Sequence, residues 1–190
     1  MLNKDNVRQI EEYYAQCELE GANEHQVDEC QKAVAKMEVI IGDPDRLRAV
    51  AEDFIKHYET RVAEGATVAG KAMFVCSNRN IAYDFYKIVK ELRPKWTEKK
   101  ICDDGVVLSE KDKKECKSME KIKLVTTRNK DHEKDLFDML GTKEDRKEFD
   151  RQFKNPKSNF KIAIVVDMWL TGFDVPELDT IYIDKPIQQH

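Results

Sequence analysis

The sequence IAIVVDMWLTGFDVP, at residues 162–176, decides the fold that we expect for this chain. Its first five residues form a continuous apolar run, which is typical of a strand buried on both faces of a parallel sheet. A polar turn follows directly and ends at Asp174, a carboxylate that we expect to be buried. Ligands bind beyond the carboxyl ends of parallel strands. The polar residues predicted at that edge are Asp167, Thr171, Gly172 and Asp174.

Residues 65–190 alternate between strand-like and helix-like segments. The predicted strands are 72–76, 122–126, 162–166 and 180–183, and the predicted helices are 78–92 and 142–153. Strands separated by helices are joined by right-handed crossovers into a parallel sheet. The expected fold class is therefore α/β, a parallel sheet flanked by helices, preceded by an N-terminal helical segment.

Residues 1–64 carry three amphipathic helix patterns, at 7–17, 27–41 and 47–62. Asp43 is placed to cap the third helix, and Pro44 suits its first turn, where a missing N–H costs nothing. We expect a helical linker or accessory segment over 1–64 and the α/β domain over 65–190. The apolar stripes of the three N-terminal helices predict packing rather than ligand binding. Residues 97–120 are rich in Lys, Asp and Glu, which predicts a charge-mixed surface insertion.

Composition narrows the class of protein. The formal net charge is -4, which argues against a strongly basic nucleic-acid binder, although a local groove can still be positive. The five cysteines form no CxxC pair, which favours reduced thiols in a cytoplasmic protein. We find no apolar run of the roughly 20 residues that a membrane span needs. The sequence therefore predicts a cytoplasmic protein without a membrane partner.

One motif is misleading. Residues 65–71 match the GxxxxGK pattern of a phosphate-binding loop. A working loop follows a strand, opens a helix and carries Ser or Thr after its lysine, whereas this one follows a helix, leads into a strand and carries Ala72. We expect no phosphate site there, and no metal ligands elsewhere in the chain.

The wording MWLTGFDVP at 168–176, followed by Asp-Lys-Pro at 184–186, resembles motif V of the motor in the R subunit of type I restriction enzymes. The resemblance covers about residues 70–190 and extends through the segments 72–86, 125–127, 141–143 and 153–156. It implies a RecA-like fold, and the part it matches is the second of two motor domains.

In this family ATP lies between the two RecA-like domains, and the intact subunit translocates double-stranded DNA before cleavage. The resemblance implies that ATP and Mg²⁺ serve the intact subunit and that this fragment binds neither alone. The implied partners are double-stranded DNA, the first RecA-like domain of the same subunit, and the modification and specificity subunits. In members of this family, a histidine that matches His190 is followed by motif VI. The arginines of motif VI stabilise the transferring phosphoryl group. The resemblance therefore predicts a fragment without ATPase or nuclease activity.

The resemblance assigns roles within motif V. Thr171 is similar to a residue that contacts a DNA phosphate, while Gly172 and Asp174 are similar to residues at the nucleotide. Gly172 lets the backbone approach its ligand closely. For Asp174 an alternative stays open, in which the carboxylate caps a turn or pairs with a neighbouring cation. Trp169 is expected to pack beneath the site, with base stacking as the alternative.

Ser77, Asn78 and Arg79 resemble motif IV, where polar groups at a helix N-terminus bind backbone phosphates. Capping of the helix by Ser77 or Asn78 explains the same residues equally well. Thr126, with Thr127 beside it, occupies the place of a further phosphate-contacting threonine. We therefore predict nucleic-acid contacts from Ser77, Asn78, Arg79, Thr126 and Thr171, and no catalytic residue in this chain.

Two other functions stay open from the sequence. One is a non-catalytic RecA-like module that binds protein or DNA. The other is a different superfamily two helicase or remodeller, although such a protein is not expected to share the long motif V sequence.

Overall fold

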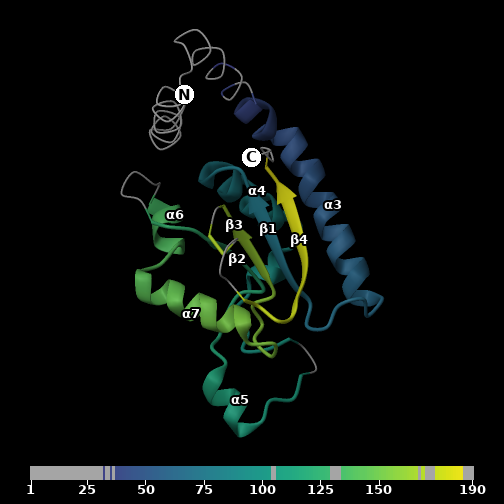
Figure 1. Ribbon diagram of the computed structural model, residues 1–190, viewed down its shortest axis with the longest axis vertical. Helices are drawn as coiled ribbons and strands as arrows, with labels where there is room; N and C mark the ends of the chain where they lie inside the picture. The colour runs from purple at the N-terminus through teal and green to yellow at the C-terminus, as the bar shows by residue number, and fades with distance from the viewer. Residues whose placement is uncertain are drawn as a thin grey trace, which may run out of the picture. The chain divides into compact units, whose positions relative to one another are not determined.

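The computed structural model describes residues 32, 35, 37–103, 106–128, 134–166, 168–169 and 174–185 (Figure 1). The chain forms two compact units, residues 1–46 and 47–190. The helices expected at 7–17 and 27–41 lie outside the described residues, except that 32, 35 and 37–41 are helical as predicted. The second unit carries all the described strands. The expected boundary at residue 64 stays a prediction.

Helix α3, Pro44–Ala63, is the third helix expected from the N-terminal pattern. The Oδ1 atom of Asp43 accepts a hydrogen bond from the backbone N–H of Arg46 at 3.0 Å, which satisfies one of the N–H groups left free at a helix start. Its buried stripe consists of Leu47, Ala51, Phe54, Ile55 and Tyr58. The spacing of three and four places these side chains on one face, and this face packs on the sheet.

The four described strands form one parallel sheet in the order β2-β3-β1-β4. They are β1 (Lys71–Cys76), β2 (Ile122–Val125), β3 (Ile162–Val165) and β4 (Leu178–Asp184). Every residue of the three strands β1 to β3 is buried, and for β3 the continuous apolar run predicts this. The four predicted strands and the α/β fold class are confirmed.

One surface of the sheet, here called the α4 face, is covered by α3 and by α4 (Arg79–Leu92). The ring of Phe74 in β1 stacks on Phe85 of α4 with 3.9 Å between centroids, and it meets Phe54 of α3 edge to face at 5.2 Å. The short 3-10 helix η1 (Pro94–Thr97) adds Trp96, whose ring lies 5.5 Å from that of Tyr58. These aromatic contacts bury the α4 face.

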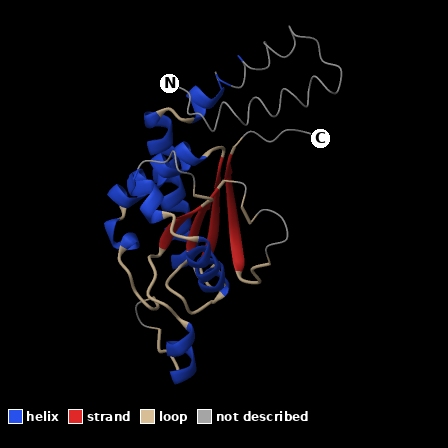
Figure 2. Cartoon of the chain, turned by 90° about the vertical axis from the view of Figure 1, so that its left-hand side faces the viewer, coloured by secondary structure: helices blue, strands red, loops and turns tan. Residues whose placement is uncertain are grey.

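The opposite surface, here called the α7 face, is covered by α7 (Lys143–Lys154). Phe153 of this helix belongs to one buried cluster with Met73, Val75 and Val165 of the sheet. A capping box formed by Thr142 and Asp145 starts α7, at the beginning of the helix predicted over 142–153. A further short helix, α6 (Lys134–Met139), precedes it and was not predicted. Figure 2 shows most of the helices to the left of the strands.

The insertion at 97–120 projects from the body and carries α5 (Glu110–Glu115), which has no buried residue (Figure 1). Its flanks are fixed to α7 by the side chain of Gln152. The amide Nε2 donates to the carbonyl of Glu115 at 2.8 Å, and Oε1 accepts from the backbone N–H of Lys117 at 3.0 Å. The surface insertion is confirmed, although a helix that we did not predict forms its tip.

Lys71, the lysine of the misleading GxxxxGK pattern, begins β1 and is 1% exposed. Its Nζ donates to the carbonyls of Phe160 at 2.5 Å and of Gln152 at 3.5 Å. This lysine is therefore a buried core residue at the amino end of the strands. Within the described residues, none of the helices is both long and apolar enough to cross a bilayer.

Burial, together with the charge of nearby Lys161, lowers the pKa of Lys71 to about 7. The unfolded chain holds this proton up to pH 10, so between these values the unfolded state binds more protons and stability rises with pH. We predict that this group contributes about 1 kcal/mol of added stability per pH unit between pH 7.5 and 8.5. Urea unfolding at both pH values, compared between the chain and Lys71→Met, measures it. An equal pH slope in both proteins contradicts the assignment.

Candidate functional site

The sheet register brings the ends of three strands into one row. Val75 of β1 pairs with Val165 of β3, and Val165 pairs with Val125 of β2. The residues that follow these three positions must therefore leave the sheet along the same edge, here called the carboxyl edge. In parallel sheets this is the edge where ligands bind.

The turn after β1 is built around the start of α4. Asn78 is the N-cap, and its Oδ1 accepts a hydrogen bond from the backbone N–H of Ile81 at 3.0 Å. The capping role that the sequence left open is therefore taken by Asn78. The hydroxyl Oγ of Ser77 is buried and has no hydrogen-bond partner among the residues that the structure describes. A buried hydroxyl without a partner is costly, which makes Ser77 a notable feature of this edge.

Arg79 links the ends of β1 and β2. Its Nη2 donates a hydrogen bond to Oγ1 of Thr127 at 2.7 Å, although 48 residues separate the two in sequence. Because β3 lies between β1 and β2, this bond spans the end of the central strand. The structure thus brings together one predicted site residue, Arg79, and the threonine segment that follows β2.

The two threonines after β2 differ in exposure. Thr126, the predicted contact, is only 2% exposed, whereas Thr127 is exposed and bonded to Arg79. Thr127 is therefore the accessible hydroxyl of this pair. The alternation of a strand could have signalled this, because neighbouring side chains at a strand end point to opposite sides.

The turn from β3 to β4 is described in part. Of the predicted edge residues, Asp167, Thr171 and Gly172 lie outside the described residues. Asp174 is described, and it is exposed. Our expectation of a buried carboxylate is wrong, because it is the following residue, Val175, that enters the hydrophobic cluster on the α7 face. An exposed carboxylate keeps its hydration and needs no buried partner.

Trp169 fixes the start of this turn. Its ring stacks on Phe153 with 5.4 Å between centroids and an interplanar angle of 21°. Its backbone φ is +66°, in the left-handed region that large residues rarely adopt. The stacking contact holds the residue in this conformation, so the expected packing role is confirmed. Strained residues of this kind are concentrated near functional sites.

Cationic groups surround the beginning of α7. Arg128, after β2, lies over the ring of Phe137 at 3.7 Å and donates from Nε to the carbonyl of that residue at 2.7 Å. Hydrogen bonds from the backbone and hydroxyl of Thr142 hold the pKa of Asp145 below its usual range, and the charges of Arg128 and Lys123 add to this effect. The sequence analysis did not single out Arg128 as a site residue.

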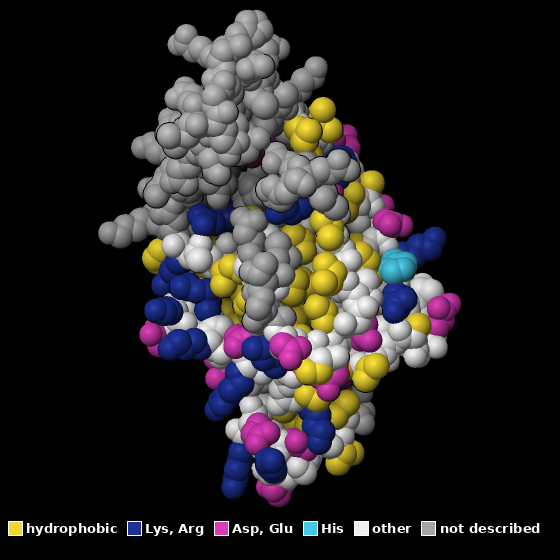
Figure 3. Space-filling model, viewed as in Figure 1, with side chains coloured by type: hydrophobic (Ala, Val, Ile, Leu, Met, Phe, Trp, Pro, Cys, Tyr) yellow, Lys and Arg dark blue, Asp and Glu magenta, His cyan; other side chains and the backbone are white. Residues whose placement is uncertain are grey.

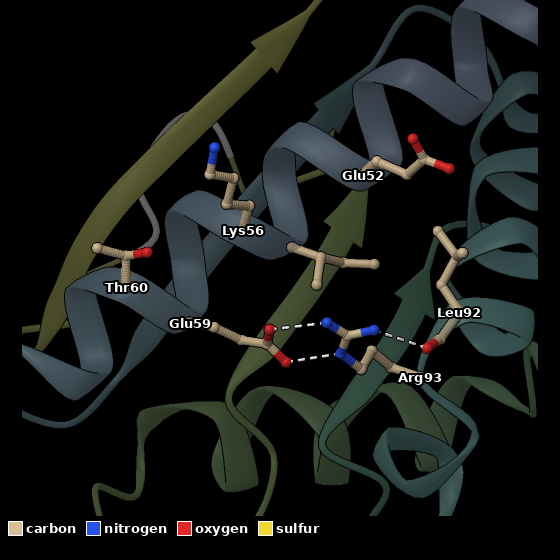
Figure 4. A pocket seen from close by; sticks show the side chains of 7 residues that line it. Glu52, Lys56, Glu59, Thr60, Leu92 and Arg93 are labelled. Atoms are coloured by element: carbon tan, nitrogen blue, oxygen red, sulfur yellow. Dashed lines mark hydrogen bonds and ion pairs between the residues drawn. The ribbon is translucent and has the colours of Figure 1, made fainter.

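No three of the described His, Cys, Asp and Glu residues gather as metal ligands. A separate groove of about 300 Å³ lies between α3 and the end of α4 (Figure 4). Ile55 and Leu92 give it an apolar part, and Arg93 and Glu59 form a doubly hydrogen-bonded ion pair on its wall. Arg93 follows the last turn of α4, far from the N-terminus of that helix. The groove is therefore not part of the carboxyl edge.

Comparison with known families gives a match over most of the α/β unit. The family described as "Type I restriction enzyme subunit R domain 3" matches residues 68–190. The match begins just before β1 and includes the complete described sheet.

Individual proteins of this kind are also similar. The "Type I restriction enzyme HindI endonuclease subunit" of Haemophilus influenzae is 33% identical over 153 residues, which are 80% of this chain and 13% of that protein. The "Putative type I restriction enzyme MjaIXP endonuclease subunit" of Methanocaldococcus jannaschii is 34% identical over 171 residues, 89% of this chain and 14% of that protein. The chain thus spans about one seventh of the length of these relatives.

Proposed function

This chain belongs to the type I restriction enzyme R subunit family, as its domain 3, and we propose that it supplies the second RecA-like half of an ATP-driven DNA translocation motor. The observation that carries this proposal is the Arg79–Thr127 hydrogen bond across the carboxyl edge. It joins two segments that resemble separate DNA-contacting motifs of such motors. The intact subunit would move double-stranded DNA before cleaving it.

The carboxyl edge has the groups that a phosphate backbone requires. Arg79 carries a guanidinium, which binds phosphate oxygens by charge-assisted hydrogen bonds. Its bond to Thr127 orients the side chain at the N-terminus of α4, where the helix dipole also favours an anion. Thr171, which the resemblance assigns to a DNA phosphate, would add a further hydroxyl. Contacts of this type hold DNA without reading its sequence.

Asp174 and Gly172 belong on the nucleotide side of the proposed site. The described residues fit ATP only in part. Asp174 is exposed and able to accept a hydrogen bond from a ribose hydroxyl, whereas Lys71 is buried and cannot hold phosphates. The first RecA-like domain would supply the phosphate and Mg²⁺ contacts. Hydrolysis of the bound ATP would supply the free energy for movement. This chain would contribute contacts to one side of the nucleotide.

The remaining partners follow from the family. We place the chain in the cytoplasm, in a complex with the modification and specificity subunits, and the specificity subunit would read the DNA sequence. When the two motor domains close on the nucleotide, Asp174 would move with the turn that carries Thr171. The contacts of this chain with DNA would therefore change each time the two motor domains close.

The DNA contact is tested by Arg79→Ala in the complete subunit. Loss of one charge-assisted phosphate contact is expected to weaken binding of double-stranded DNA by about tenfold or more and to lower the salt slope of binding by about one. Fluorescence anisotropy over a range of salt concentrations measures both. Arg48→Ala is the matched control, since Arg48 is an exposed α3 residue paired with Glu91. Equal losses in both variants would overturn the assignment.

The nucleotide contact is tested by Asp174→Ala in the complete subunit. We expect lower ATP hydrolysis and a lower translocation rate, with DNA affinity unchanged, because the carboxylate would act only on the nucleotide side. Glu177→Ala is the matched control, since Glu177 is a second carboxylate of the same β3–β4 connection and its charge acts on the buried Lys71. An Asp174 variant with unchanged ATPase and step rate would contradict the role.

The isolated 190-residue chain is predicted to hydrolyse no ATP in the presence of Mg²⁺ and DNA. It lacks the match to the arginines of motif VI, which would stabilise charge on the transferring phosphoryl group. A phosphate-release assay, calibrated with the complete subunit, measures this. ATP hydrolysis that persists after further purification of the chain would contradict the proposal that other parts of the subunit supply the groups needed for hydrolysis.

A further inference from the structure

A second arginine, Arg128, lies at the carboxyl edge beside the Arg79–Thr127 pair. It directly follows Thr127, so the Cα atoms of these two residues are about 3.8 Å apart. Arg79 reaches the exposed Thr127 from the start of α4, whereas the side chain of Arg128 contacts α6. Two arginines from different parts of the chain are therefore held next to one exposed threonine.

Helix α6 holds the Arg128 side chain in one orientation. The guanidinium carbon lies 3.7 Å from the centroid of the Phe137 ring, and Nε donates a hydrogen bond to the carbonyl of Phe137 at 2.7 Å. A guanidinium that stacks on an aromatic ring covers one of its faces and keeps the N–H groups at its edge. This contact therefore fixes the group without using most of its donors.

Four N–H donors of Arg128 remain after this contact. A guanidinium carries five N–H groups, and Nε uses one of them. No described residue accepts a hydrogen bond from the two terminal nitrogens, because Oδ1 of Asp138 lies 3.9 Å from Nη2, which is longer than a hydrogen bond. The side chain of Arg128 is 26% exposed. An oriented, partly exposed set of donors of this kind suits bidentate binding of a phosphate.

The surroundings of Arg128 also favour an anion. Its charge helps to hold the pKa of Asp145 below the usual range, and this carboxylate is already engaged by the backbone N–H and hydroxyl of Thr142. Figure 3 shows Lys and Arg side chains gathered on the side of the molecule where α6 and α7 lie in Figure 1. Three lysines of these helices are exposed, namely Lys134, Lys143 and Lys147. A phosphate backbone that reaches Arg128 would therefore meet further cations.

We propose that Arg128 is a second phosphate-binding arginine of the carboxyl edge, and that it contacts the DNA backbone beside the phosphate held by Arg79. Phe137 is its positioning residue, which gives the short helix α6 a role in DNA binding. The inference rests on the proposed function, in which Arg79 contacts double-stranded DNA. Because the contact is to the backbone, it adds affinity without reading the base sequence.

Salt-dependent binding of double-stranded DNA by the complete subunit tests the proposal. Arg128→Gln removes one phosphate contact, so the slope of log K against log salt is expected to fall by about 0.9, and the affinity by about tenfold near 0.1 M salt. Arg151→Gln is the matched control, since Arg151 is an exposed α7 arginine paired with Glu148 at 2.8 Å. A loss of slope in Arg128→Gln no larger than in Arg151→Gln would overturn the proposal.

Arg128→Lys separates the charge from the fold of α6. This variant loses the same Nε hydrogen bond to Phe137 as Arg128→Gln, but it keeps one positive charge. Its slope is expected to equal that of the unchanged subunit, because counterion release depends on charge. If the slope instead falls as far as in Arg128→Gln, the loss comes from the displaced helix, and the proposal is wrong.

Arg79→Ala, measured in the same titrations, distinguishes this inference from the proposed function. The double variant Arg79→Ala, Arg128→Gln is expected to lose about 1.8 in slope, since each arginine neutralises its own phosphate. A double variant that loses no more than Arg79→Ala alone would rule out a second phosphate contact. A reduced slope for Arg79→Ala beside an unchanged slope for Arg128→Gln counts against Arg128 alone. Unchanged slopes in both single variants count against the proposed function as well.

Discussion

The whole structure depends on the burial of a parallel sheet on both faces. Because parallel strands need crossover connections, the chain must place helices on each side of the sheet. Phe74 is held between Phe54 and Phe85 on the α4 face, and Phe153 covers the α7 face. The same constraint sends every strand end to one edge. Arg79 and Thr127 meet there because β1 and β2 point in the same direction.

The two edges of the sheet differ in their chemistry. At the amino edge, buried polar groups are bonded to backbone carbonyls: Lys71 to Phe160, and Asn159 to Met119 at 2.7 Å. These bonds fix the base of the insertion, because a buried donor that lost its acceptor would cost free energy. At the carboxyl edge Thr127 is exposed, and the buried hydroxyl of Ser77 has no hydrogen-bond partner within the described part of the chain. Rigidity at one edge and available polar groups at the other suit a domain that holds a ligand.

The strands were predictable because their apolar runs have no other stable location than a covered sheet. The short helices were not. α6 buries only Leu136, and α5 buries nothing, so neither carries an apolar stripe. The Ser109–Asp112 capping box was the available sequence signal for α5.

Site residues were harder to predict than strands, because exposure changes from one residue to the next. Asp174 is exposed and Val175 is buried, and Thr126 is buried beside the exposed Thr127. A motif locates a segment, but it does not decide which of two neighbouring side chains reaches the ligand. That choice depends on tertiary packing, here the pairing of Thr127 with Arg79 from a distant turn.

The central claim is that this chain is one half of a two-domain motor. Sequencing the source gene on both sides of the segment that encodes residues 1–190 tests it most directly. If the chain is one half of such a motor, a phosphate-binding loop, an acidic box and a nuclease signature are expected upstream, and a glutamine and arginine motif is expected downstream. A reading frame that begins at Met1 and stops at His190 would contradict it and would favour a non-catalytic binding module.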